Sequence, residues 1–176
     1  MLRLVLAGVL VAVVIGLAWW FFAGPSNDSS PLPYAPDPNL PQAPDFSFPD
    51  ASGESVVLSE VTSPLRIVHF WASWDPSSAD ALEALAEIER QYGDAVAVIA
   101  LNRDAVPAEG EVYLEGLAVD DVLTFAYDKQ DSYYRELGGY NMPETVFLGS
   151  GGEILYHAHG PMTIEELTRT TQRLVQ

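Results

Sequence analysis

The sequence predicts an α/β domain in which helices flank a mixed central sheet, preceded by one hydrophobic N-terminal segment. Two nearly unbroken apolar runs, at 65–71 and 95–101, are typical of strands that are buried on both faces. An amphipathic helical pattern separates the two runs, which indicates a parallel β-α-β unit. Two later apolar runs flank a Ser-Gly-Gly turn and indicate an antiparallel hairpin. The sheet is therefore expected to be mixed.

The N-terminal segment is predicted to be a transmembrane signal anchor. Residues 4–23 contain no charged side chain, and twenty residues are enough for a helix to cross a bilayer. Arg3 precedes the run, so we expect residues 1–3 in the cytoplasm and the rest of the chain outside it, in the periplasm if the organism is bacterial. A cleaved signal peptide is the alternative, but Phe21 and Phe22 stand where cleavage requires a small residue.

Residues 24–44 are predicted to be an extracytoplasmic linker. Seven prolines fall in this stretch among serine, asparagine and aspartate residues. Such a composition cannot bury a core and favours extended chain, partly polyproline II. The folded domain is expected to occupy residues 45–176.

The first half of that domain is predicted to contain four strands and one helix. Short strands are expected at 46–48 and 55–58, and buried strands at 65–71 and 95–101. The helix between the two buried strands has an apolar stripe, formed by Leu82, Leu85, Ile88 and Tyr92.

The second half is predicted to end in a hairpin and a helix. Before them we expect a weak helix at 109–117, a short strand at 123–127 and a short helix at 132–137. The hairpin strands are expected at 145–148 and 153–157. Thr163-Ile164-Glu165-Glu166 is a capping-box sequence that starts the last helix.

Composition limits the chemistry and the partners of the chain. The sequence has 25 acidic and 8 basic residues, a net charge of −17, and so offers no basic surface for nucleic acid or for anionic lipid. It contains no cysteine, which excludes a disulfide, a thiolate nucleophile and a cysteine metal site. The acidity favours a solvated, self-repelling surface over a specific cationic partner.

The turn after the strand at 65–71 contains the residues of greatest chemical interest, Trp71-Ala72-Ser73-Trp74-Asp75-Pro76-Ser77-Ser78. Asp75 is predicted to be the N-cap of the following helix, because its carboxylate can accept bonds from the free N–H groups of the first turn. Pro76 would then occupy the first helical position, where its missing N–H is not needed.

This turn resembles the active-site segment of thioredoxin-like proteins. In particular, Phe70-Trp71-Ala72-Ser73-Trp74 is similar to the start of the F-W-A-x-W-C-x-x-C segment of membrane-anchored TlpA/ResA-type thiol–disulfide oxidoreductases. The resemblance extends from about Asp45 to the C-terminus. It includes Asn141-Met142-Pro143-Glu144-Thr145, which is similar to the family's cis-proline loop. It implies a thioredoxin-like fold with an added N-terminal hairpin, preceded by one transmembrane helix.

The sequence departs from this family at the residues that perform its chemistry. Asp75 and Ser78 stand where the family has its two cysteines. Glu144 follows the proline, where the family commonly has threonine. A serine hydroxyl is too weak an acid to replace a thiolate unaided. Disulfide exchange by this chain is therefore excluded, and no catalytic residue is assigned.

Peptide binding is the family property that the sequence retains. If the Met142–Pro143 bond is cis, as the resemblance implies, the backbone of Met142 can pair with an extended segment of a partner. The expected partner-binding residues are Trp74, Asp75, Pro76, Ser77, Ser78, Met142 and Pro143. Asp75 has two interpretations: a helix cap, or a fixed negative charge that imitates a reduced thiolate. Likewise, Pro143 and Trp74 could serve structure alone.

Other sites have weaker support in the sequence. His157-Ala158-His159 places two imidazoles on one face of a strand, but a third ligand such as His69 is not expected nearby, so no metal site is assigned. A Ser/His/Asp hydrolase that uses Ser77 or Ser78 lacks a G-x-S-x-G motif. No cofactor is expected.

These observations favour a single-pass membrane protein that holds a redox-inactive thioredoxin-like domain outside the cytoplasm as a protein-binding or assembly module. The resemblance implies a partner among thiol–disulfide or cytochrome-maturation components. Two alternatives stay open: a structural subunit of an envelope complex, and an enzyme of non-thiol chemistry that uses Asp75 or Ser78.

Overall fold

The computed structural model describes residues 40–119 and 121–175. The predicted cytoplasmic terminus, the membrane segment at 4–23 and nearly all of the linker lie outside these residues. Among the helices that the structure does describe, none combines the length and the apolar character needed to cross a bilayer.

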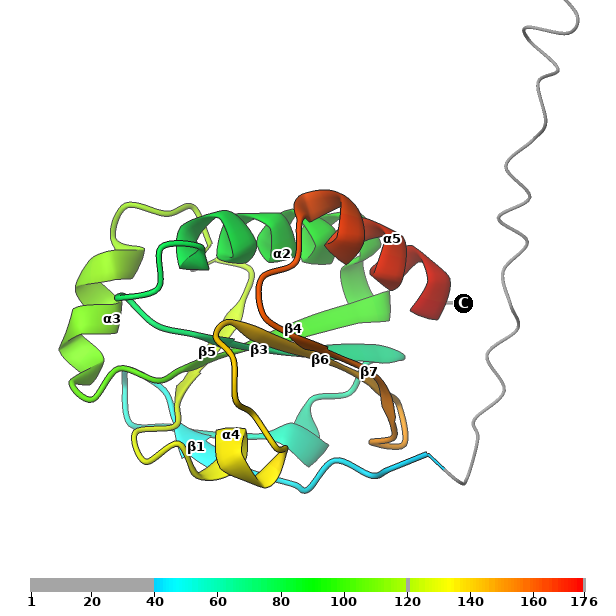
Figure 1. Ribbon diagram of the computed structural model, residues 1–176, viewed down its shortest axis with the longest axis horizontal. Helices are drawn as coiled ribbons and strands as arrows, with labels where there is room; N and C mark the ends of the chain where they lie inside the picture. Colours follow the sequence, from blue (N-terminus) through cyan, green and yellow to red (C-terminus); the bar gives the residue numbers. More distant parts are fainter. Residues whose placement is uncertain (1–39, 120, 176) are drawn as a thin grey trace, which may run out of the picture. The chain divides into compact units, whose positions relative to one another are not determined.

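A five-stranded mixed sheet forms the centre of the domain, as the sequence predicts (Figure 1). Its strands are β3 (Leu65–Trp71), β4 (Val96–Asn102), β5 (Thr124–Tyr127), β6 (Glu144–Gly149) and β7 (Ile154–His159), in the spatial order β5-β4-β3-β6-β7. The first three are parallel to one another, whereas β6 runs antiparallel to β3 and β7 antiparallel to β6. Strand β7 is therefore an edge of the sheet.

Different elements cover the two faces of the sheet (Figure 1). Helices α2 (Ser78–Tyr92) and α5 (Ile164–Leu174) lie on one face, with α3 (Pro107–Leu114) at the side. Helix α4 (Ser132–Glu136) lies on the other face, together with a separate antiparallel hairpin of β1 (Ser47–Pro49) and β2 (Ser55–Val57). Short 3₁₀ turns follow β2, at Leu58–Glu60, and α2, at Gly93–Ala95. The predicted layers and the added hairpin are present.

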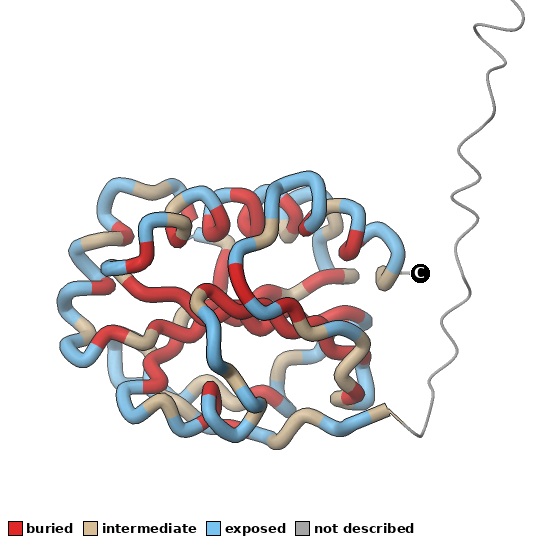
Figure 2. Tube along the Cα trace, in the orientation of Figure 1, coloured by how far each residue is buried: buried red, intermediate tan, exposed pale blue. Residues whose placement is uncertain are grey.

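Each face of the sheet has its own apolar core, and buried chain concentrates along the strands between them (Figure 2). Alternate residues of β3 supply both cores, which is why this strand reads as one unbroken apolar run. Leu65, Ile67 and Trp71 enter the core beneath α2, which we call the α2 core. Val68 and Phe70 enter the core beneath the hairpin, which we call the hairpin core.

Most element boundaries fall within two residues of the prediction, and two differences matter. Strand β7 extends to His159 instead of ending at His157, so both imidazoles belong to one strand. The packed chain also begins before residue 45, because Ala43 N–H donates to Gly152 C=O at 2.9 Å and Ile154 N–H to Pro41 C=O at 2.8 Å. The end of the predicted linker is thus part of the domain.

A β-bulge sets the register between β6 and β7. Near the turn Leu148 pairs with Ile154, but the next pair is Phe147 with Tyr156, so Leu155 is an extra residue on β7. Leu155 packs against the α2 core, and the ring of its neighbour Tyr156 contacts Phe147 of the same core. Beyond the bulge Glu144 lies opposite His159. The extra residue moves every later side chain of β7 to the other face of the sheet.

Candidate functional site

The segment Ala72–Ser78, called the 72–78 turn below, connects β3 to α2 and differs in one respect from the prediction. Helix α2 begins at Ser78 with Ser77 in the N-cap position, two residues after Asp75. The Asp75 carboxylate accepts bonds from Ser77 N–H at 2.8 Å and Ser77 O–H at 2.7 Å. Ser78 N–H in turn donates to Asp75 C=O. Asp75 therefore caps a tight turn that precedes α2, and Pro76 lies in that turn.

Ser78 closes the 72–78 turn from inside. Its side chain is fully buried, and its hydroxyl donates to Ala72 C=O at 2.9 Å while accepting from Ala72 N–H at 3.3 Å. Both ends of the turn are thereby joined. The hydroxyl is engaged in structure and is out of reach of an external substrate.

Asp104 holds the other side of the turn, a role that sequence reasoning missed. This buried carboxylate, just beyond β4, accepts bonds from Ser73 N–H at 3.0 Å and Ser73 O–H at 3.0 Å. The Asn102 side chain donates to it at 2.7 Å. One signal in the sequence could have indicated this role: Asn102 and Asp104 are polar residues at the end of a buried strand. The carboxyl end of that strand lies at the same end of the sheet as the 72–78 turn.

The predicted partner-binding residues divide into accessible and inaccessible groups. The Trp74 side chain is 60% exposed, Pro76 is exposed, and Ser77 and Met142 are half-buried. Asp75, only 6% exposed, Ser78 and Pro143 are buried. A partner can therefore contact Trp74, Pro76, Ser77 and Met142 directly.

The loop that precedes β6 lies beside the 72–78 turn, and its Met142–Pro143 bond is cis. A small cavity of about 160 Å³ joins the two segments: Ser77 and Ala81 line it from the turn and α2, Pro143 from the loop, and Ile164 from the start of α5. Within the residues that the structure describes, the backbone N–H and C=O of Met142 form no hydrogen bond. These two groups are free to pair with an added chain.

His69 lies in the sheet next to this region and is fully buried. Its Nδ1 lies 2.9 Å from the Thr145 hydroxyl, while its Nε2 has no hydrogen-bond partner in the described part of the chain. Burial lowers the pKa of His69 to about 4, although the negative charge of Asp75 acts in the opposite direction. The imidazole is therefore neutral near pH 7.

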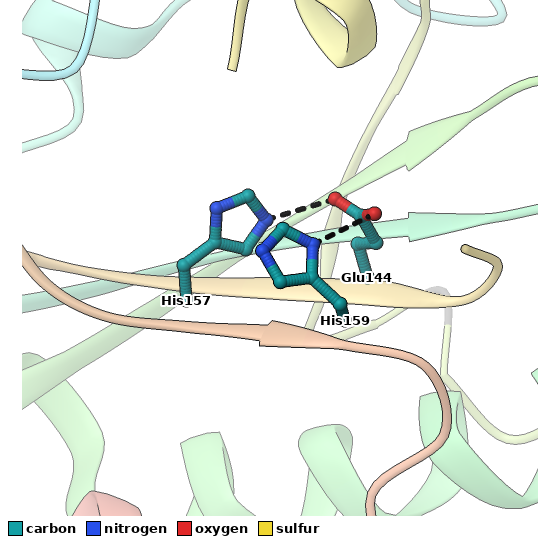
Figure 3. Close-up of side chains that lie close together, drawn as sticks. All are labelled: Glu144, His157 and His159. Carbon is teal, nitrogen blue, oxygen red and sulfur yellow. Dashed lines mark hydrogen bonds and ion pairs between the residues drawn. The ribbon is translucent and has the colours of Figure 1, made fainter. Parts of the chain in front are cut away.

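Glu144 forms a second cluster with both histidines of β7 (Figure 3). Its Oε2 lies 2.8 Å from His157 Nε2, and its Oε1 lies 3.0 Å from His159 Nδ1. The sequence singled out the two histidines but not Glu144 as their neighbour. The bulge in β7 brings them together, because without it the histidines would lie on the face opposite Glu144.

The Glu144 carboxylate is fully buried, yet it is ionised. Burial alone would raise its pKa, but hydrogen bonds from Asn141 N–H, His159, Tyr140 N–H and His157 together lower it. The pKa of His157 is also lowered, mainly by burial, against the influence of Glu144. One buried carboxylate thus faces two imidazoles at the edge of the sheet.

No family model matches the sequence. Among curated proteins, the chain is 27% identical over 170 residues to the thiol:disulfide interchange protein DsbE of Allochromatium vinosum, an alignment that covers 96% of this chain and 89% of the relative. It is also 27% identical over 172 residues to the thioredoxin-like protein YneN of Bacillus subtilis, covering 95% of this chain and 96% of the relative.

A comparison with solved structures also finds a thiol:disulfide interchange protein. A structure assigned to a thiol:disulfide interchange protein DsbE from Chlorobium tepidum superimposes with a TM-score of 0.69 at 25% identity, and the match covers 76% of this chain and 93% of that one. The thioredoxin-like fold that the sequence predicts is therefore confirmed. The chain has thioredoxin-like thiol:disulfide oxidoreductases as relatives but contains no cysteine.

Proposed function

We propose that this protein is a membrane-anchored, extracytoplasmic thioredoxin-like protein that no longer exchanges disulfides and binds an extended segment of a partner protein. The observation that carries the proposal is the unpaired backbone of Met142, in the loop whose Pro143 shares a cavity with Ser77, together with the exposed ring of Trp74 in the 72–78 turn. A segment that pairs with the Met142 backbone gains main-chain hydrogen bonds, and Trp74 offers the kind of aromatic surface that contributes strongly to binding.

The loss of redox chemistry follows from the two residues at the cysteine positions. Ser78 uses its hydroxyl to close the turn, and Asp75 uses its carboxylate to cap it. Burial of the Asp75 carboxylate favours the capping role over the alternative in which its charge imitates a thiolate for a partner. The turn keeps its shape without a disulfide.

The setting of the protein is carried over from the relatives and from the N-terminal sequence. Relatives named for thiol:disulfide interchange suggest a partner that handles disulfides, and the resemblance in the sequence adds cytochrome-maturation components to the candidates. The apolar run at 4–23 and Arg3 suggest a single membrane pass with the domain outside the cytoplasm. A structural subunit of an envelope complex stays as the alternative.

A hydrolase built on the serines of the turn has little support. Within the described residues no hydrogen bond joins Ser77 or Ser78 to a histidine, because His69 contacts Thr145 and the other two histidines contact Glu144. A serine without an adjacent base is a weak nucleophile. Non-thiol enzymology at Asp75 or Ser78 would also need access to buried side chains.

Site-specific photocrosslinking in cells tests the proposal. A photoreactive amino acid at position 74 or 142 is expected to capture a partner protein. The matched control is position 112 on α3, where Val112 is 65% exposed but belongs to neither the 72–78 turn nor the loop before β6. Capture at 74 and 142 but not at 112 supports partner binding at these two segments. Capture that occurs only from positions in 4–23 or 24–44 would favour the structural subunit and contradict peptide binding.

A further inference from the structure

We propose that Glu144, His157 and His159 bind one divalent transition-metal ion of the zinc type. Each residue offers one ligand atom, and these three atoms all lie within 4.8 Å of one another. Two imidazole nitrogens and a carboxylate oxygen are ligands that Zn²⁺ and neighbouring divalent ions accept together. Nothing in this ligand set requires the cysteines that the chain lacks.

The spacing of the cluster suits an ion with little rearrangement. His157 Nε2 lies 2.8 Å from Oε2, and His159 Nδ1 lies 3.0 Å from Oε1 of the same carboxylate. Ligands that each lie about 2.1 Å from a tetrahedral zinc ion are roughly 3.4 Å apart, so His157 Nε2 and Oε2 must separate by only a few tenths of an ångström. The three ligand atoms already lie within 4.8 Å of one another, so His159 needs a shift of comparable scale. Each ring nitrogen that donates to the carboxylate carries a hydrogen. A metal ion would take the place of these two hydrogens, and each neutral imidazole would then carry its hydrogen on its other ring nitrogen.

The Glu144 carboxylate is held in place by groups other than the histidines. Its Oε1 accepts bonds from Tyr140 N–H at 2.7 Å and Asn141 N–H at 3.0 Å. These two bonds persist when the imidazoles turn from donors into metal ligands. Support of this kind orients a coordinating carboxylate and is typical of metal sites in proteins. Oε2 faces only His157 and is the oxygen available to the ion.

The cluster is accessible to solvent through its two imidazoles. The side chains of His157 and His159 are 15% and 30% exposed, and β7 is an edge strand. The Tyr140 ring stacks on His159 with ring centres 4.5 Å apart and is itself largely exposed. An ion can therefore enter, and with three protein ligands it would keep a position for water or another exchangeable ligand.

Metal titration of the full-length protein, purified in detergent without a polyhistidine tag, tests this inference. We expect one Zn²⁺ per chain in competition with a chromophoric chelator. Glu144→Gln and His157→Gln should each weaken binding by at least about tenfold. The control, Glu83→Gln, removes the same charge from an exposed position on α2 and should leave the affinity unchanged. Equal affinities in all variants would assign the ion to the acidic surface and overturn the proposal.

A second measurement uses the unmodified sequence and does not depend on whether the variants fold. The chain has three histidines, so the ring signals of each can be assigned by NMR after nitrogen-15 labelling. Substoichiometric Co²⁺ should broaden or shift the signals of the ligands His157 and His159 much more strongly than those of the more distant, uncoordinated His69. Broadening of none of the three, or of His69 alone, would exclude the site.

Discussion

At the residue scale, Asp75 and Ser78 occupy the positions of the family's two cysteines and serve to hold the turn in shape. A disulfide would link the two positions to each other. In this protein each position is linked to the backbone instead, Asp75 to Ser77 and Ser78 to Ala72. Neither Asp75 nor Ser78 has a buried side-chain polar atom without a hydrogen-bond partner in the described structure.

His69 provides a residue-scale prediction about pH. Its pKa is about 4 in the folded protein, below the ordinary 6.5, so the unfolded chain binds a proton in the window where the folded chain does not. The free energy of unfolding should therefore fall as the pH decreases from about 6.5 to about 4, by up to roughly 3 kcal/mol from this residue. His69→Leu should flatten that slope in urea unfolding measured across the window.

The control for this measurement is Thr145→Val, which removes the hydroxyl beside His69 but keeps the titrating ring. It should retain the pH slope of the wild type even if its overall stability is lower. A slope that His69→Leu leaves unchanged would show that His69 is not the titrating group.

At the element scale, the 72–78 turn lies at the amino end of helix α2. The turn is fixed at one end by Ser78 and at the other by Asp104, and the bonds of Asp104 to Ser73 do not involve position 75 or 78. The amino end of a helix stabilises a thiolate. We therefore expect the 72–78 turn to tolerate a cysteine at position 75 and another at position 78.

The corresponding prediction is a gain of activity. In an insulin-reduction assay the wild-type protein should show no turnover above the blank, because it contains no thiol. The double variant Asp75→Cys/Ser78→Cys should form an intramolecular disulfide and show measurable turnover. Ser78→Cys alone has no partner thiol and should stay inactive. A folded double variant whose thiols never pair would mean that the turn has lost the required geometry.

At the scale of the whole molecule, the acidic excess sets the response to salt. With 25 acidic and 8 basic residues, repulsion within the chain opposes the compact state. Raising the ionic strength from about 0.01 M to about 0.15 M shortens the screening length from roughly 30 Å to roughly 8 Å. The free energy of unfolding should rise over this range by about 1 kcal/mol, and the urea midpoint should rise with it.

Urea unfolding at a series of NaCl concentrations measures this effect, and its concentration dependence is the control. Screening acts mainly below about 0.15 M, whereas exclusion of salt from the protein surface increases steadily at higher concentration. Stabilisation that begins only well above that range would contradict charge repulsion as its cause.

The fold was largely predictable from the sequence because its signals are local. The buried strand at 65–71 and the capping box at Thr163 appear as predicted. The contacts of Asp104 with Ser73 and of Glu144 with the two histidines were not predictable in this way. They join residues that are far apart in the chain, and the second depends on strand register, which hydrophobic alternation alone does not reveal.

The extra residue in β7 has a consequence for how such a site persists or is lost. If β7 paired with β6 without a bulge and kept Leu155, both histidines would lie on the face opposite Glu144. Deleting Leu155 would instead give a regular hairpin that keeps the later pairs, Glu144 opposite His159 and Val146 opposite His157. The cluster should therefore survive the loss of the bulged residue but not a one-residue slip of the strand. Among homologues, the pairing register of this hairpin would then report on the site as directly as the identity of its residues.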